Sequence, residues 1–82
     1  MIISAQVAIY PLRQERLTPA ITAVSDALRA AGLRPEMGAM STTVTGDAAV
    51  VFAALQEGFL VAGAIGHVVM TVTISNACPV NR

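Results

Sequence analysis

A set of short, uncharged polar side chains occupies one side of the strands that this sequence predicts. In three segments of alternating polarity, the side away from the apolar core carries Gln6, Ala8, Tyr10, Thr43, Thr45, Thr71 and Thr73. A solvated face usually carries Lys and Glu, and a subunit interface is usually more apolar. Hydroxyls with one carboxamide and one phenol suit a site that binds the hydrogen-bonding edges of a neutral ring. The alternative is that the threonines are structural, because threonine favours strands.

The sequence carries no recognisable machinery for covalent or metal chemistry. It has no phosphate-binding glycine loop, no paired catalytic carboxylates and no nucleophile elbow. His67 has no carboxylate or cysteine near it in sequence, which favours a surface turn position. Cys78 is the single cysteine, so it cannot form an internal disulfide or a four-cysteine zinc site, and we expect it to be inert. We therefore expect no enzyme, no metal site and no cofactor.

The composition favours an apolar or small-molecule partner over nucleic acid. The 82 residues make one domain, of which 55% are hydrophobic and 12% charged. A chain this short buries only about 60–65% of its unfolded surface, so the apolar surplus is expected to face a partner subunit, a ligand or a membrane. The five basic residues are all arginines, scattered and balanced by five acids. The concentrated positive face that a phosphate backbone requires is absent.

The most apolar stretch of the sequence, residues 48–74, is too interrupted to predict a membrane span. Gln56 and Glu57 break it near the middle, and His67 breaks it again. The uncharged run 58–74 has 17 residues, whereas a spanning helix needs roughly 20. The first residues also lack the positive leader of a signal peptide. We expect a cytoplasmic protein with no membrane span.

Alternating and helical spacings predict six elements that position the polar set. Strands are expected at 3–10, 35–39, 42–45 and 68–75, and helices at 18–31 and 48–62. The first helix is predicted to begin with the Thr18 hydroxyl as its cap and with Pro19 at the first helical position. Gly32 is expected to end it. Asp47 suits the positive end of the second helix.

The order β-α-β-β-α-β predicts a ferredoxin-like α+β sandwich with an antiparallel sheet in the order 4-1-3-2. Both helices would lie on one face, over the single domain 1–82. The first helix has an apolar stripe that consists of Leu17, Ile21, Val24, Leu28 and Ala31. On the second strand, Met37 and Ala39 are expected to point inward. The second helix is apolar enough to be covered on more than one side, and Phe52, Phe59 and Met70 are expected in the core or in an interface.

Three segments of the chain resemble a known family. They are Ser4-Ala5-Gln6-Val7-Ala8-Ile9-Tyr10-Pro11-Leu12, Ser41-Thr42-Thr43-Val44-Thr45-Gly46-Asp47 and Val68-Val69-Met70-Thr71-Val72-Thr73-Ile74-Ser75, with Val51-Phe52-Ala53-Ala54-Leu55 between them. They are similar to the YkoF-type thiamine/hydroxymethylpyrimidine-binding family and its single-domain relatives. The resemblance implies non-enzymatic binding of thiamine or its hydroxymethylpyrimidine moiety, in vitamin B1 uptake or salvage. YkoF-type members carry two repeats, so it implies that a second copy completes this chain as a homodimer or homotetramer.

This resemblance gives a chemical role to each candidate ligand-binding residue. The aminopyrimidine presents a donor beside a ring acceptor, and the Gln6 carboxamide matches that pair as Asn or Gln matches adenine. The Tyr10 ring could stack on the pyrimidine or contact the thiazolium cation, and Glu36 could balance that cation. Hydroxyl or backbone contacts are expected from Ser41, Thr42, Thr43 and Thr71, with the Thr42 side chain leaning toward the core.

Other functions remain open on sequence grounds. An ACT-like regulatory module, which senses small molecules such as amino acids, uses a similar sheet but needs a fused effector. A metal carrier or small enzyme of this shape would need a Cys-x-x-Cys motif or an acid–base pair. For each candidate residue, a purely structural role also stays open: Gln6 could bond neighbouring threonines, Tyr10 could pack in a subunit contact, and Glu36 could be an ordinary exposed carboxylate.

Overall fold

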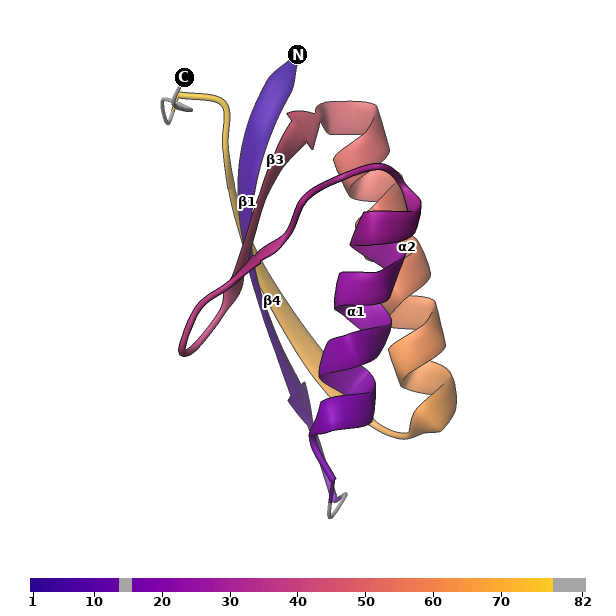
Figure 1. Ribbon diagram of the computed structural model, residues 1–82. Helices are drawn as coiled ribbons and strands as arrows, with labels where there is room; N and C mark the ends of the chain where they lie inside the picture. Colours follow the sequence, from indigo (N-terminus) through magenta and orange to yellow (C-terminus); the bar gives the residue numbers. More distant parts are fainter. Residues whose placement is uncertain (14–15, 78–82) are drawn as a thin grey trace.

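The computed structural model describes residues 1–13 and 16–77 and has the element order that the sequence predicts. Along the chain it consists of β1 (Ile2–Pro11), α1 (Thr18–Ala30), β2 (Glu36–Met37), β3 (Thr42–Asp47), α2 (Ala48–Ile65) and β4 (Val68–Ser75). The strands form one antiparallel sheet in the order β2-β3-β1-β4, which is the predicted order counted from the other edge. Both helices cover one face of this sheet (Figure 1). The ferredoxin-like fold is therefore confirmed.

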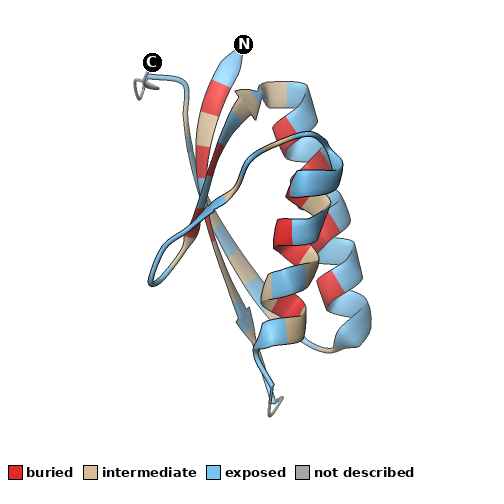
Figure 2. Cartoon of the chain, viewed as in Figure 1, coloured by how far each residue is buried: buried red, intermediate tan, exposed pale blue. Residues whose placement is uncertain are grey.

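The core lies between the two helices and the sheet, where the buried positions of Figure 2 gather. The period-two alternation of β1 sends Ile3, Ala5 and Val7 to this side. Leu28 of α1 and Val51 of α2 are fully buried against them. The remaining members of this cluster are Val24, Val44, Ala54 and Leu55. Because β1 alternates, the side chains between its core residues must point away from the helices.

Helix α1 begins at Thr18, one residue earlier than a cap at Thr18 would require. Leu17 is the N-cap, because its carbonyl accepts the first helical hydrogen bond from the Ile21 amide (3.4 Å), and its apolar side chain makes no capping bond. The prediction of a Thr18 hydroxyl cap is therefore wrong, although Pro19 does lie in the first turn. At the other end, Gly32 has a φ of 86°, which confirms the left-handed stop.

Three element boundaries or faces also differ from the sequence prediction. β2 is two residues long instead of five, because the Gly38 amide donates to the Ser41 carbonyl (2.7 Å) and closes a turn. The predicted inward pair, Met37 and Ala39, does line the cavity on the helix side of the sheet, but both residues are exposed there and Ala39 lies beyond the strand. On the α1 stripe, Val24 and Leu28 are buried and Ile21 is half-buried, whereas the two end positions, Leu17 and Ala31, are exposed.

Helix α2 connects β3 to β4 and packs closely on α1. The Asp47 carboxylate caps it by accepting from the Ala49 amide (3.2 Å), as the sequence predicts, and the helix continues three residues past Ala62. At Gly58 a Cβ atom would lie 3.1 Å from the Val24 Cα. The helix is long and apolar enough by composition to cross a membrane. Only 28% of it is buried within the chain, so most of its surface is uncovered. The expectation that α2 is covered on more than one side is wrong for the single chain.

Candidate ligand-binding face

The outer face, which is the side of the sheet turned away from both helices, carries the predicted polar set. Here β1 lies between β3 and β4, so its outward side chains have neighbours on both sides. The face is defined by the outward positions of the four strands. They are Ser4, Gln6, Ala8 and Tyr10 of β1, Glu36 of β2, Thr43 and Thr45 of β3, and Val69, Thr71, Thr73 and Ser75 of β4.

One straight row of polar side chains crosses all four strands of this face. The register pairs Glu36 with Thr43, Thr43 with Gln6, and Gln6 with Thr73. Directly opposite residues have Cβ atoms about 4.5–5.5 Å apart, so each side chain in the row can contact the next. Glu36 is the one charged member of the row. The register therefore places Gln6 at the centre of the hydroxyl-bearing face.

The Gln6 carboxamide is held by a hydroxyl from the residue just before β3. Its Nε2 donates to the Ser41 Oγ, with the two atoms 3.2 Å apart. The sequence predicted both residues as candidates, but the contact depends on the turn that Gly38 and Ser41 close. This bond uses one of the two Nε2 hydrogens, so the carbonyl oxygen and the second N–H of Gln6 are the groups that could bond a ligand.

Ala8 makes a low, flat patch between larger polar groups. It lies on β1 between Gln6 and Tyr10, and it pairs with Thr71 of β4. Residues on one side of a strand repeat every 6.6 Å or so, which places the Cα atoms of Gln6 and Tyr10 about 13 Å apart. The Tyr10 side chain is 48% exposed. A planar ring could lie over Ala8 with hydrogen-bonding groups at its edges and an aromatic ring at one end.

The next row of the outer face contains serines that sequence reasoning did not select. Ser4 pairs with Thr45 and with Ser75, and the Ser4 and Thr45 hydroxyl oxygens are 3.1 Å apart. The alternation of β1 places Ser4 on this side, which is the signal that could have identified it. It lies on the same face one row away from Gln6, so it is a suitable control position for Gln6.

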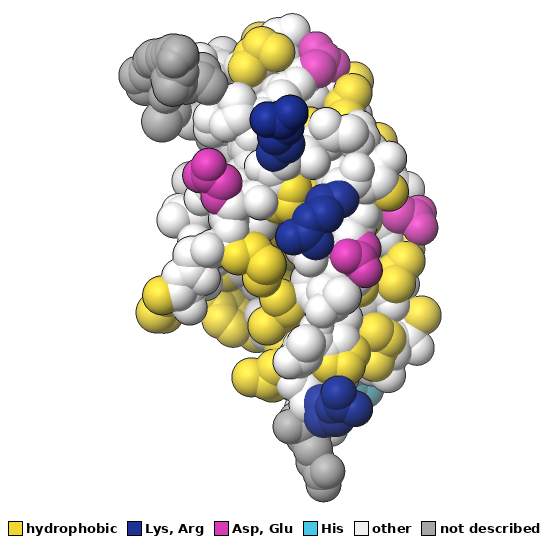
Figure 3. Space-filling view, in the orientation of Figure 1, with side chains coloured by type: hydrophobic (Ala, Val, Ile, Leu, Met, Phe, Trp, Pro, Cys, Tyr) yellow, Lys and Arg dark blue, Asp and Glu magenta, His cyan; other side chains and the backbone are white. Residues whose placement is uncertain are grey.

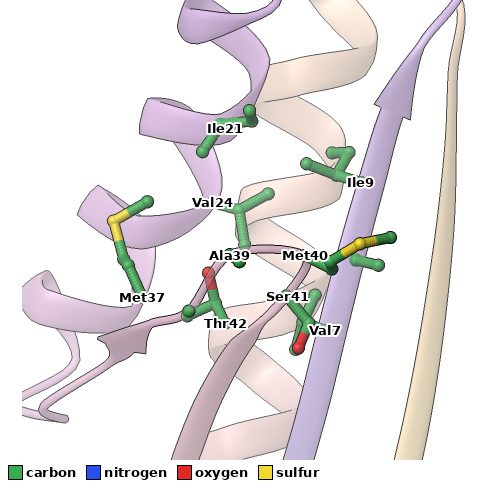
Figure 4. Close-up of a pocket in the computed structure, with 11 residues that line it drawn as sticks. Val7, Ile9, Ile21, Val24, Met37, Ala39, Met40, Ser41 and Thr42 are labelled. Carbon is green, nitrogen blue, oxygen red and sulfur yellow. The ribbon is translucent and has the colours of Figure 1, made fainter.

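Thr42 lies on the other side of the sheet from the remaining candidates. Its side chain is 8% exposed and lines a cavity of 130 Å³ between α1 and the turn before β3 (Figure 4). Val7, Ile21 and Met37 line the same cavity. Ligand pockets usually measure about 300–1,000 Å³, so this one is small for an organic ligand. The expectation that the Thr42 side chain leans toward the core agrees with this position, and the residue is not part of the outer face.

A second hollow lies between α2 and β4. It is a shallow apolar groove of about 440 Å³, lined by Phe52, Leu55, Gln56 and Phe59 of α2 and by Met70, Val72 and Ile74 of β4. Phe52 is 53% exposed and Phe59 is 40% exposed, so both lie in this groove and not in the core. We name it the α2–β4 groove.

Charges and metal ligands are sparse among the residues that the structure describes. On the side of the molecule that Figure 3 shows, acidic and basic side chains are scattered among hydrophobic ones. No group of three His, Cys, Asp or Glu side chains that could hold a metal ion occurs within residues 1–13 and 16–77. The His67 carbonyl accepts from the Leu12 amide (2.8 Å) at the beginning of β4. Cys78 lies outside the described residues.

Solved structures from bacteria and an archaeon share this fold. A Streptococcus pneumoniae protein superposes with a TM-score of 0.86 at 22% identity, covering 99% of this chain and 92% of its own. A hypothetical Methanocaldococcus jannascii protein gives 0.84 at 22% identity, with coverages of 94% and 81%. A Thermotoga maritima protein, provisionally assigned to thiamine biosynthesis or salvage, gives 0.80 at 18% identity, with coverages of 92% and 83%.

The sequence comparisons are more specific than the structural ones. No curated protein matches the chain significantly. A family model does match, and it is described as the YKOF-related Family and covers residues 2–81. This match spans every strand and helix described above, including the two strands that flank β1. The chain therefore belongs to the YKOF-related family.

Proposed function

We propose that this protein binds thiamine or its hydroxymethylpyrimidine moiety on the outer face, without catalysing a reaction, in cytoplasmic vitamin B1 uptake or salvage. Membership of the YKOF-related family supports a thiamine-related role, as does the provisional assignment of the Thermotoga maritima neighbour to thiamine biosynthesis or salvage. The observation that carries the proposal is the row Glu36–Thr43–Gln6–Thr73 beside the flat patch at Ala8.

The Gln6–Ser41 pair offers the complement of an aminopyrimidine edge. Because Gln6 Nε2 donates to Ser41 Oγ, the Gln6 carbonyl oxygen can accept a hydrogen bond from an exocyclic amino group. The Ser41 hydroxyl can in turn donate to the neighbouring ring nitrogen, since a hydroxyl both accepts and donates. A neutral donor–acceptor pair of this kind favours a neutral heterocycle over a carboxylate or a phosphate.

The length of the face suits a two-ring ligand. With Gln6 and Tyr10 about 13 Å apart at Cα, a single pyrimidine bound at Gln6 would leave the Tyr10 ring largely unused. Thiamine would place its cationic thiazolium within reach of Tyr10, where cation–π attraction contributes about 0.5–2 kcal/mol. Glu36 lies two strands from Gln6, roughly 10 Å away, and would attract the same cation more weakly.

A second copy of the chain is part of this proposal. Ligand sites typically bury 70–90% of a small molecule, whereas a sheet surface can cover one side of a flat ring. We infer a homodimer or homotetramer in which a partner covers the other side. An ACT-like sensing module has the same fold and makes a different prediction, namely binding of amino acids.

Titration calorimetry on the purified full chain tests the proposal, with thiamine, hydroxymethylpyrimidine and a panel of amino acids titrated separately. We expect micromolar binding of thiamine or hydroxymethylpyrimidine. Gln6→Ala should weaken binding of both by about fivefold or more, since a lost hydrogen-bonding pair contributes about 1–3 kcal/mol. Ser4→Ala, one row away, should bind normally. Tyr10→Ala should weaken thiamine more than hydroxymethylpyrimidine. Absence of heat with both compounds, or binding of amino acids alone, would refute the proposal.

A further inference from the structure

The sheet has a gap beside the C-terminal end of β1. The β1–β3 register ends at the pair Val7–Thr42, whereas β1 itself continues to Pro11. The chain before β3 does not run on as a strand, because the Gly38 amide donates to the Ser41 carbonyl (2.7 Å) and closes what we name the β2–β3 turn. The end of β1 therefore has a strand neighbour, β4, on one side only.

The backbone N–H and C=O groups of Ile9 point into this gap. The Ala48 amide donates to the Met1 carbonyl (2.8 Å), and these two residues are opposite when the β1–β3 register is continued by one pair. Bonded pairs alternate along an antiparallel ladder, so the odd-numbered residues of β1 bond toward β3. Ile9 is the first odd-numbered residue beyond the ladder. Within the part of the chain that the structure describes, no backbone bond joins it to the β2–β3 turn.

The cavity of 130 Å³ between α1 and the β2–β3 turn opens onto this gap. Its lining includes Ala8 and Ile9 of β1, Val24 of α1, and Met40 and Ser41 of the turn (Figure 4). Among the described residues, none that lines it is charged. A ligand of two rings needs a larger pocket, but an apolar cavity of about 150 Å³ holds one benzene molecule. The cavity therefore suits a single uncharged six-membered ring.

The Ile9 backbone determines which edge such a ring must carry. At a bonded position of an antiparallel strand, the N–H and the C=O of one residue point in the same direction. A ring nitrogen can accept from this N–H while an amino group on the adjacent ring carbon donates to this C=O. The Thr42 side chain, which is 8% exposed, lines the same cavity, and its hydroxyl can donate to a second ring nitrogen.

Two methionines of the cavity lining favour an aromatic occupant. Met37 is 54% exposed and Met40 is 82% exposed, so neither contributes to the core. Figure 4 shows them flanking the other lining side chains. Methionine side chains are flexible enough to adapt to a ligand, and their sulfur atoms make favourable contacts with aromatic rings. Closure of the two side chains over a bound ring would give them the packing that they lack in the free chain.

We propose that this cavity is a second binding site, which takes a single-ring aminoheterocycle with its amino group beside a ring nitrogen, as in cytosine or a 4-aminopyrimidine, through the Ile9 backbone. The site goes beyond the proposed function, because the cavity lies on the helix side of the sheet and thiamine is placed on the outer face. The two sites share one residue. Ser41 lines the cavity, and its hydroxyl accepts from Gln6 Nε2 of the outer face (3.2 Å).

A nuclear magnetic resonance titration of the full chain with 4-aminopyrimidine tests this site. The four methionine methyl groups, labelled with ¹³C, report a nearby aromatic ring. We expect the Met37 and Met40 signals to shift and those of Met1 and Met70, which do not line the cavity, to stay. With the ligand at ten times its Kd, only about one tenth of the sites are free, so hydrogen exchange of the Ile9 amide should slow about tenfold.

Two related rings provide the chemical controls. Pyrimidine has the ring nitrogens without the amino group, and uracil presents a donor and an acceptor in the reverse arrangement. Each loses at least one hydrogen bond with Ile9. Each should therefore bind at least about fivefold more weakly than 4-aminopyrimidine, since a hydrogen bond contributes about 1 kcal/mol.

Substitutions in the lining test the placement of the ring. Thr42→Val removes the hydroxyl and should weaken binding of 4-aminopyrimidine about fivefold. Ala39→Leu fills part of the cavity and should weaken it at least tenfold, while circular dichroism stays unchanged because Ala39 is exposed. Thr45→Val is the matched control for Thr42→Val, since it lies on the same strand but on the outer face. It should bind 4-aminopyrimidine normally.

Several outcomes would overturn the second site. They are unchanged Met37 and Met40 methyl signals at millimolar 4-aminopyrimidine, equal affinity for pyrimidine, or normal binding by Ala39→Leu. Displacement of 4-aminopyrimidine from Met37 by thiamine would also refute it, because one site would then serve both ligands. A shift at Met37 in a chain that does not bind thiamine would support the cavity site and refute the proposed function. Cytosine and hydroxymethylpyrimidine, titrated separately, distinguish a nucleobase from a vitamin precursor as the source of the ring.

Discussion

Substitution of Ala8 by leucine would separate ligand binding from folding. Ala8 lies between Gln6 and Tyr10 on the outer face and opposite Thr71, so a leucine there would occupy the space above the sheet where a ring is proposed to lie. A flat ring that covers Ala8 buries roughly 100 Å² of apolar surface on that side, about half of what a whole aromatic side chain buries. At 25 cal/mol per Å² this contact contributes about 2.5 kcal/mol.

The expected result is a loss of affinity without a loss of structure. A change of 2.5 kcal/mol corresponds to a roughly 70-fold higher Kd for thiamine, which calorimetry or ligand competition would measure. The free energy of unfolding should change by no more than about 0.5 kcal/mol, as for a surface position. Thr45→Leu, on the same face two rows away, should bind normally. If Ala8→Leu binds within twofold of the unmodified chain, the ligand does not lie on this face.

Three further predictions concern the scaffold and are measured by urea unfolding followed by circular dichroism. Leu28→Ala should lower the free energy of unfolding by about 2–5 kcal/mol, because Leu28 is fully buried; a smaller loss would mean that the core between the helices is loosely packed. Asp47→Ala should cost about 1 kcal/mol through loss of the cap on the Ala49 amide, whereas Asp47→Asn should retain most of it. Gly63→Ala should stabilise by about 0.5–1 kcal/mol, since a Cβ there meets no atom within 4 Å. Gly58→Ala should stabilise the protein less than Gly63→Ala, because its Cβ would press on α1. Equal changes in the free energy of unfolding for the two variants would contradict the close approach of α1 and α2 at Gly58.

The fold was predictable because local patterns and chain order agree. The alternation of β1 and β4 gave the two faces, and two crossovers in the observed order leave few sheet topologies. The errors lie at element ends, where local signals compete. Thr18 precedes a proline and suits a cap, yet the first helical bond goes to the Leu17 carbonyl. β2 stops at Met37 because a backbone bond from Gly38 closes the turn, and side-chain periodicity does not reveal that bond.

The candidate site was predictable in part. The alternation along each strand places Gln6, Thr43 and Thr73 on one face, and the sequence sufficed for this. Their alignment in one row follows from the register that the structure shows. The same parity sends Thr42 to the helix side. The bond between Gln6 and Ser41 was not predictable, because Ser41 lies in a turn with no fixed register. The exposure of Phe52 was also hidden, since an apolar helical stripe looks alike whether its own chain or another chain covers it.

The two edges of this sheet are unequal, and the inequality limits how far the chain can assemble. At the far edge, β2 offers only Glu36 and Met37, and one of them is charged. A strand that docks at β4 therefore finds no second edge of similar length from which another copy could continue. Growth through strand addition would end after one step, so an unguarded edge can persist in this protein without seeding filaments.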